Sequence, residues 1–390
     1  MPSQTIHQCI QRDGLTTPAF IYDEEAILQT LASLQSLRRG SGLRILYSVK
    51  ALPFMELLKI IAPLVDGFSV SSLFEARLAR ETLGNSRTIS ITTPGFREDE
   101  LREIATLCRH VAFNSVNQWR RFKISLRGEA QGGLRINPQL SFLEDARYDP
   151  CRKHSKLGVP LTEVKSILSD EPETLSGLAG VHFHTLFTAR DFKPLALTID
   201  HLEERLGPWL SSLAWINLGG GYLLDDPEAL SDLGPIVEHL RHRYGVEVLF
   251  EPGKGVVGQA GYLVASVLDL FESDGKRVAV LDTSVNHLPE VFEYQIRPMI
   301  AETQETGPYR YLIVGASCLS GDVFGEYGFD HTLETGSRLT FVNVGAYTLV
   351  KASRFNGINL PAIYAYTPRG GFELKKFYDY AHYRAQWTSG

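Results

Sequence analysis

Cysteine is scarce in this sequence. Four are present among 390 residues, namely Cys9, Cys108, Cys151 and Cys318. No two of them form a C-x-x-C pair, so the zinc and thiol-redox motifs built on that spacing are excluded, and no metal site is expected. Isolated cysteines in a chain of this length are typical of reduced thiols, which makes the cytoplasm the expected location.

Long apolar runs are missing as well. No run reaches the roughly 18 apolar residues of a membrane span, and residues 1–12 lack the apolar core of a signal peptide. An excess of basic residues is also absent, because 39 lysines and arginines stand against 45 aspartates and glutamates, a net charge of −6. This balance argues against a nucleic-acid or membrane partner and is compatible with a cationic ligand.

What the sequence does contain is a regular alternation of short apolar runs with helical patterns. Eight such runs lie at 45–49, 67–71, 88–92, 110–114, 133–137, 178–184, 215–219 and 247–251. Segments of helical periodicity separate them, such as 55–62 and 73–83. Strands alternating with helices indicate parallel βαβ units, and eight of them predict a closed (β/α)8 barrel of the TIM type, with an open doubly wound sheet as the alternative.

The pattern changes after Pro252. Short β-rich runs at 256–268, 278–281, 309–315, 339–344 and 363–366 replace the helices. We therefore expect an α/β protein with a barrel at 31–255 and an antiparallel, β-rich C-terminal domain at 256–390. An N-terminal segment at 1–30 carries the apolar run 19–22, which is a candidate strand of the second domain.

The ends of the predicted barrel strands carry reactive residues, as expected for a barrel enzyme. They are Lys50 after the first strand, His182 and His184 at the sixth, Gly219, Gly220 and Gly221 at the seventh, and Glu251 at the eighth. Read singly, each has an ordinary structural interpretation as a solvated lysine, a turn of glycines or a buried acid. Read together they suit pyridoxal 5'-phosphate: Lys50 supplies a Schiff-base amine, the glycines a phosphate cradle and Glu251 a partner for the pyridine nitrogen.

Two turns of small residues stand out in the C-terminal domain. The segment 315–322 contains Cys318 and Asp322, and the segment 345–348 contains Tyr347. Cys318 is either an inert packing residue or part of a polar cluster with the acids that follow it. Tyr347 is either a packing residue or a hydrogen-bond donor to a phosphate.

Several longer segments carry a resemblance to a known family. They are RKHSKLG at 152–158, LDTS at 281–284, HLPEV at 287–291, QIRP at 295–298, CLSGDVFGEY at 318–327 and FNG at 355–357. With these segments, the chain resembles the fold-type III, alanine racemase-like pyridoxal-phosphate decarboxylases from residue 17 to about 366. Within that family it is most similar to the carboxynorspermidine (carboxyspermidine) decarboxylases of polyamine biosynthesis.

The resemblance implies a role for each candidate residue. Lys50 and Cys318 are the catalytic residues, and Lys50 also attaches the cofactor. His184 stacks on the cofactor ring, Gly219, Gly220 and Gly221 hold its phosphate with help from Tyr347, and Glu251 pairs with the ring nitrogen. Asp322 receives a substrate amine, and Glu290 and Arg297 are further candidate substrate contacts. The family works as a homodimer with shared active sites, so a second copy is the expected partner.

The expected function is therefore that of a carboxy-lyase acting on carboxynorspermidine or carboxyspermidine. Two alternatives stay open: decarboxylation of another amino acid (diaminopimelate, ornithine, lysine or a 3-amino-3-carboxypropyl compound), and a non-catalytic, decarboxylase-like binding protein. One departure bears on this choice. Where the family usually has a Cys-Glu pair soon after the barrel histidine, this chain has Phe187 and Thr188.

Overall fold

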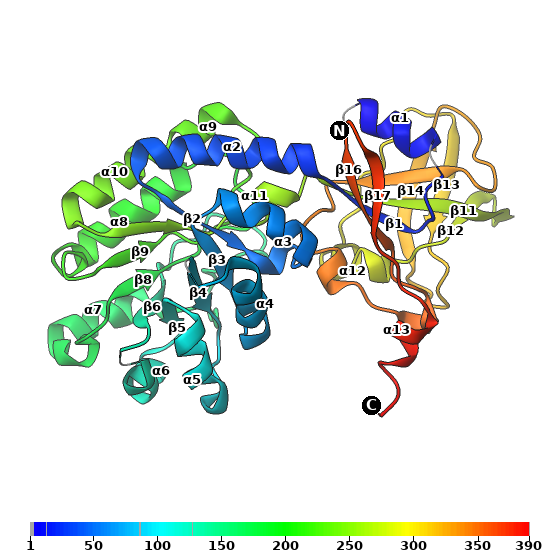
Figure 1. The fold of residues 1–390 in the computed structure, drawn as a ribbon. Helices are drawn as coiled ribbons and strands as arrows, with labels where there is room; N and C mark the ends of the chain where they lie inside the picture. The colour runs from blue at the N-terminus through cyan, green and yellow to red at the C-terminus, as the bar shows by residue number, and fades with distance from the viewer. Residues whose placement is uncertain (1–3, 13, 86, 127, 390) are drawn as a thin grey trace. The chain divides into compact units, whose positions relative to one another are not determined.

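The computed structural model describes residues 4–12, 14–85, 87–126 and 128–389 (Figure 1). The chain forms two compact units. One unit is Gln29–Val256, and the other combines Met1–Leu28 with Val257–Gly390.

The first unit is built on a ring of parallel strands. They are β2 (Arg44–Ser48), β3 (Gly67–Val70), β4 (Thr88–Thr92), β5 (His110–Phe113), β6 (Gln131–Asn137), β8 (Gly180–His182), β9 (Trp215–Asn217) and β10 (Glu247–Phe250). Each strand pairs with the next in this order, and β10 pairs with β2, so the ring is closed. The short β7 (Val159–Pro160) adds to β6 outside the ring. The predicted (β/α)8 barrel is confirmed.

Helices surround this ring (Figure 1). They are α2 (Glu24–Ser41), α3 (Met55–Ile61), α4 (Leu73–Leu83), α5 (Glu98–Leu107), α6 (Val116–Phe122), α7 (Leu161–Asp170), α8 (Lys193–Leu210), α9 (Pro227–Ser231), α10 (Leu233–Tyr244) and α11 (Lys254–Val257). Local sequence sets their ends; for example, the Ser72 side chain accepts a hydrogen bond from the Glu75 N–H and so caps α4. In the described part of the chain, no helix combines the length and apolarity needed to cross a membrane.

A large buried tryptophan packs inside the barrel. Trp215 is buried and belongs to an apolar cluster with Leu46, Ala112 and Leu249. Its ring reaches so close to Gly180 on the neighbouring strand that a Cβ there would lie 2.0 Å from a ring carbon. The large residue on β9 therefore requires a glycine on β8, which is how a small barrel accommodates a bulky interior side chain.

The second unit is a sheet with its own apolar core. Its strands are β1 (Ala19–Asp23), β11 (Gly261–Ser273), β12 (Lys276–Leu281), β13 (Tyr309–Val314), β14 (Val323–Phe329), β15 (Arg338–Val342), β16 (Ala362–Thr367) and β17 (Gly371–Lys376). The strand order is β14-β13-β12-β11-β1-β16-β17, and β15 also pairs with β11. The helices of this unit are α1 (Gln4–Arg12), α12 (Glu290–Tyr294) and α13 (Tyr380–Arg384).

The sheet differs from the antiparallel arrangement expected from the sequence. β1 pairs with β16 in parallel, and so does β12 with β13, while the other described pairings of this sheet are antiparallel. The parallel pairs arise because β1 comes from the N-terminal end of the chain, and because a long connection separates β12 from β13. β14 was not predicted from the sequence, because its Gly325, Glu326 and Gly328 interrupt the apolar pattern.

Candidate active site

Lys50 lies just beyond the first barrel strand. β2 ends at Ser48, and Lys50 occupies a short 3-10 turn (Val49–Ala51) rather than the strand end itself. The side chain is partly open to solvent, but many protein atoms at the mouth of the barrel surround its amine and exclude water from it. This burial lowers the pKa of Lys50, against the raising effect of Glu251, and Arg135 lowers it further. A larger neutral fraction makes the amine a better nucleophile.

Glu251 follows β10 and is buried with two partners. The Asn217 Nδ2 donates a hydrogen bond of 2.7 Å to its Oε1, and the His182 Nε2 lies 3.5 Å from its Oε2. Burial alone would raise the pKa of Glu251, but His182, Lys50 and Asn217 together lower it below its ordinary value. Burial lowers the pKa of His182, so this ring is a neutral donor beside a charged carboxylate.

The three glycines after β9 are required by close backbone contacts. A Cβ on Gly219 would lie 2.4 Å from the Phe183 carbonyl oxygen, one on Gly220 2.2 Å from that of Glu251, and one on Gly221 2.3 Å from that of Leu186. Gly219 and Gly221 also have positive φ angles of 66° and 98°.

The amides of this turn are not all available to a ligand. The Gly219 N–H donates to Asn217 and the Gly220 N–H donates to the Nδ1 of His184, at 2.9 and 3.0 Å. In the described part of the chain, the Gly221 N–H has no hydrogen bond of its own. The predicted phosphate cradle therefore offers one amide rather than three.

His184 is held in one tautomer by this contact. Burial lowers its pKa well below the ordinary value, and the charges of Lys50 and Arg135 lower it further. The neutral ring accepts from Gly220 at Nδ1, so its proton sits on Nε2.

Two charged residues at the barrel mouth received no role from the sequence, although Arg135 ends a predicted strand. Arg135, near the end of β6, is 9% exposed, its Nε has no hydrogen-bond partner among the described residues, and burial lowers its pKa to about 10. Glu75 in α4 accepts a 2.7 Å hydrogen bond from the Ser71 N–H, and burial raises its pKa. Both influence the pKa of Lys50. The position of Arg135 at the end of a strand could have indicated its role. For Glu75, the signal was its place three residues after the capping residue Ser72.

Lys254 is a third residue that was missed. It begins α11, and its Nζ lies 5.2 Å from the centre of the Phe187 ring. Phe187 follows Leu186, whose carbonyl contacts Gly221. A Cβ on the next residue, Gly255, would lie 2.5 Å from the Tyr222 carbonyl oxygen, so the backbone that carries Lys254 packs against the residue that follows the glycine turn. The place of Lys254 three residues after Glu251 could have indicated it.

The remaining candidates belong to the sheet unit. Cys318 is exposed, and its backbone N–H donates to the Asn356 Oδ1 at 2.8 Å. Asp322 is 3% exposed, and its carboxylate accepts hydrogen bonds from the Val285 N–H, the Ser317 N–H and the Ser317 hydroxyl. Donors from its own loop and from Val285 therefore occupy this carboxylate, and the expected contact with a substrate amine stays a prediction.

The sheet unit also contains three further candidate residues. Glu290 begins α12, is half-buried, and its Oε1 has no hydrogen-bond partner among the described residues. The exposed Arg297 guanidinium lies 4.3 Å from the centre of the Tyr327 ring. Tyr347 is half-buried in the turn after β15 and has a positive φ of 62°.

The structure thus brings part of the predicted site together within one unit. Lys50, His184, Glu251 and the glycine turn share the mouth of the barrel, linked by the contacts above. Cys318, Asp322, Glu290, Arg297 and Tyr347 lie in the other unit. Among the described residues, no cluster of three His, Cys, Asp or Glu side chains is suited to a metal ion.

The barrel mouth fits pyridoxal phosphate. It offers an amine of lowered pKa, an ionised buried acid, and a glycine turn with one available amide beside a cation. These are the groups that the aldehyde, the ring nitrogen and the phosphate of this cofactor require.

Comparisons with known proteins agree with this geometry. The chain is 35% identical over 380 residues to a carboxyaminopropylagmatine decarboxylase of Synechocystis sp., covering 95% of each chain. It is 32% identical to a carboxynorspermidine/carboxyspermidine decarboxylase of Campylobacter jejuni, covering 95% of this chain and 98% of the relative. A crystal structure of carboxynorspermidine decarboxylase with norspermidine, from Campylobacter jejuni, matches with a TM-score of 0.85 and 30% identity over 95% of this chain and 100% of that one.

The family model described as "Pyridoxal-dependent decarboxylase, C-terminal sheet domain" matches residues 19–345. That match spans the whole barrel unit and much of the sheet unit. Pyridoxal phosphate is accordingly the cofactor and carboxy-lyase chemistry the activity. This chain belongs to the pyridoxal-dependent decarboxylases.

Proposed function

We propose that the substrate is an amino acid in which a 3-amino-3-carboxypropyl group is joined to an amine chain, namely carboxynorspermidine or carboxyspermidine. The observation that carries this proposal is the nearly full-length similarity to the Campylobacter jejuni enzyme of that name. The product would be a polyamine, so the enzyme would act in polyamine biosynthesis.

A second candidate substrate is carboxyaminopropylagmatine. The Synechocystis relative named for it is 35% identical over 95% of this chain. This compound carries a guanidinium at the far end where the carboxypolyamines carry an ammonium. The head group is shared, so the same residues at the barrel mouth would serve either substrate.

Each of the barrel residues would contact a different part of the cofactor. Lys50 would be the attachment amine, and Glu251, ionised between His182 and Asn217, would keep the ring nitrogen protonated. The Gly221 N–H and Lys254 would meet the phosphate, and the neutral His184 ring would stack on the cofactor. When bound, the cofactor supplies the electron sink for the pair left on the α-carbon as carbon dioxide departs.

A proton must then return to the α-carbon. Cys318 is the proposed acid, with Lys50 as the alternative. The exposed position of the Cys318 thiol supports this role, since a buried thiol could not reach a substrate.

We also propose a homodimer in which a partner chain completes each site. The candidate catalytic residues Lys50 and Cys318 lie in different units of the chain. The resemblance to the family supports this assembly. A cytoplasmic location is proposed as well, supported by the four free cysteines.

The experiment that tests the substrate proposal is product analysis with a panel of amino acids. Purified holoenzyme would be incubated separately with carboxynorspermidine, carboxyspermidine, carboxyaminopropylagmatine, diaminopimelate and ornithine. We expect the highest kcat/KM with a carboxypolyamine. Preferred turnover of carboxyaminopropylagmatine would select the second candidate, and turnover of diaminopimelate or ornithine alone would overturn both.

The residues after His184 provide a sharper version of this test. Replacing Phe187 and Thr188 by Cys and Glu introduces an acid that the carboxynorspermidine branch has there. If the native chain already accepts carboxypolyamines well, this double substitution should bring little gain. A large gain for carboxypolyamines would indicate that the native chain prefers a different amine.

A further inference from the structure

The N-terminal end of the barrel, opposite the Lys50 end, holds an arginine-rich hollow. Its volume is about 600 Å³, and the arginines that line it are Arg38, Arg44, Arg109 and Arg241. An adjoining hollow of about 350 Å³ shares Arg44 and Arg109 and adds Arg87. Among the described residues that line the two hollows, five arginines face two carboxylates, Asp66 and Glu247. This is an excess of three positive charges in a chain whose net charge is −6.

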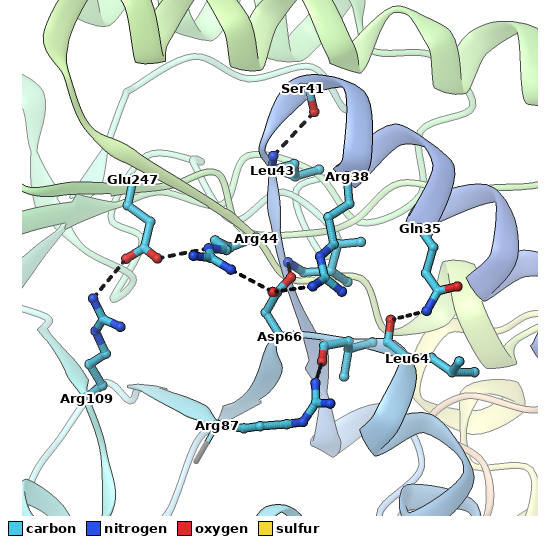
Figure 2. A network of polar contacts seen from close by, with 12 residues as sticks. Gln35, Arg38, Ser41, Leu43, Arg44, Leu64, Asp66, Arg87, Arg109 and Glu247 are labelled. Carbon is cyan, nitrogen blue, oxygen red and sulfur yellow. Dashed lines mark hydrogen bonds and ion pairs between the residues drawn. The ribbon is translucent and has the colours of Figure 1, made fainter.

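The two carboxylates are already shared by three of the arginines (Figure 2). Asp66 lies 3.2 Å from Arg38 and 3.0 Å from Arg44, and it also accepts a hydrogen bond from the Ile45 N–H. Glu247 lies 3.2 Å from Arg44 and 3.5 Å from Arg109. A purely structural ion-pair network would be complete with these five side chains.

Arg241 is held in place without an acid. Its Nη1 donates to the Ser41 carbonyl at 2.7 Å, and its guanidinium lies against Gly42. A Cβ on Gly42 would come within 2.2 Å of that Nη1, and Gly42 has a positive φ of 75°. No carboxylate of the described residues pairs with Arg241. Contacts with the backbone of Ser41 and Gly42 therefore orient its guanidinium. Arg87 is similar, since it donates to the carbonyls of Val65 and Pro63.

A buried polar side chain lies beside the hollow. His110 is fully buried at the start of β5, and neither ring nitrogen has a hydrogen-bond partner among the described residues. Its Nε2 is 3.9 Å from the Glu247 Oε2, too far for a hydrogen bond. Burial lowers the pKa of His110 to about 3, so the ring does not compete as a cation for Glu247.

We propose that this hollow binds a small phosphorylated anion. Guanidinium groups pair with phosphate oxygens through two parallel hydrogen bonds, and a tetrahedral phosphate can meet donors that arrive from several directions. Here the arginine donors come from four places in the fold: from α2, from β2, from α10 and from the residue that precedes β5. The volume lies in the range of small-molecule sites. The site is independent of the proposed substrate, because it involves none of the residues at the Lys50 end.

Binding to the holoenzyme tests the proposal. Inorganic phosphate and pyrophosphate would be titrated by calorimetry at constant ionic strength, with citrate as a carboxylate control. We expect saturable binding of one phosphate or pyrophosphate per chain and weaker binding of citrate. Using the holoenzyme keeps the cofactor's own phosphate site filled.

The matched pair of variants is Arg241→Gln and Arg243→Gln. Both remove one charge from α10, but Arg243 contacts Tyr244 and Glu203 and does not line the hollow. Arg241→Gln should weaken phosphate binding roughly 10- to 150-fold, as expected for the loss of one charge-assisted hydrogen bond. Gly42→Ala should weaken it too by displacing the Arg241 guanidinium. Absence of phosphate binding to the holoenzyme would overturn the proposal, as would equal binding of phosphate by Arg241→Gln and Arg243→Gln, or equal binding of citrate and phosphate.

Discussion

At the scale of single residues, a buried carboxylate can bind a ligand only through lone pairs that its own neighbours leave open. Asp322 accepts three hydrogen bonds from Val285 and Ser317, all within its own unit. It therefore organises the loop that carries Cys318, whatever else it does. The exposed thiol of that loop owes its position to this buried acid and to Asn356.

Asp322→Asn separates the two possible roles of this residue. The asparagine side chain would place an NH2 group against the Val285 and Ser317 donors, which need an acceptor. We therefore expect the free energy of unfolding to fall by about 1–3 kcal/mol. The kcat should fall by a similar factor for every substrate, because the Cys318 loop shifts. Thermal unfolding and steady-state kinetics measure both effects, with the exposed Asp330→Asn as the control. An unchanged stability with a raised KM that depends on the amine chain would instead assign Asp322 to the substrate.

His110 makes stability depend on pH. Its pKa is about 3 in the folded chain against an ordinary value of 6.5, so the unfolded chain binds more protons between these values. The free energy of unfolding should therefore fall as the pH drops through this window, and His110 should contribute roughly 1 kcal/mol per pH unit between pH 6 and 5.

Removing the imidazole should reduce this dependence. Urea unfolding of His110→Phe at pH 7.5, 6 and 5 should show a smaller slope of stability against pH than the native chain. His242→Phe, on the exposed face of α10, controls for the loss of one histidine. If both variants reduced the slope equally, His110 would not be the source.

At the scale of elements, the turns that follow the barrel strands carry the residues of the candidate site. The turn after β2 presents Lys50, the turn after β9 is made of glycines, and the residue after β10 is Glu251. Parallel strands bring these turns to one end of the barrel, however far apart they are in sequence. The glycine turn depends on backbone shape more than on side-chain chemistry, because its carbonyl contacts leave no room for a Cβ.

Gly219→Ala tests that dependence, with Gly245→Ala as its matched control. Both glycines have φ angles near 70°, but a Cβ on Gly245 would meet nothing within 4 Å, whereas one on Gly219 would meet the Phe183 carbonyl at 2.4 Å. Gly245→Ala should cost about 1 kcal/mol of stability from the backbone conformation alone. Gly219→Ala should cost more and should weaken binding of pyridoxal phosphate, measured by absorbance titration of the apoenzyme. Equal effects of the two substitutions would argue that the glycine turn has no part in holding the cofactor.

At the scale of the whole molecule, the candidate catalytic residues are divided between two units. Lys50 belongs to the barrel and Cys318 to the sheet unit. If a partner chain completes each site, two inactive variants should complement one another. A mixture of Lys50→Ala and Cys318→Ala should regain up to about one quarter of native activity, because random exchange makes half of the dimers hybrids, each with one intact site.

The measurement is activity after subunit exchange, with exchange itself followed by differently tagged chains. Each variant alone, treated in the same way, is the control. Proven exchange without recovered activity would show that each site lies within one chain.

The barrel and the residues at its strand ends could be predicted from the amino-acid sequence, for a physical reason. Strands of a parallel sheet are buried on both faces, so they are continuous apolar runs, and the residue that ends each run must lie at the same end of the barrel. Lys50, His184, Glu251 and the glycine turn were found in this way. The sequence also carried the segments that identify the family.

Only the tertiary structure decided how these groups influence one another. Periodicity cannot show that Asn217 and His182 hold Glu251, or that two of the three glycine amides are already occupied. Nor can it show that the distant Val285 N–H donates to Asp322. The parallel pairing of β1 with β16, and the arginines gathered at the far end of the barrel, are likewise invisible along the chain. Such contacts join residues that are distant in sequence, and a local pattern reports burial but does not name the partner.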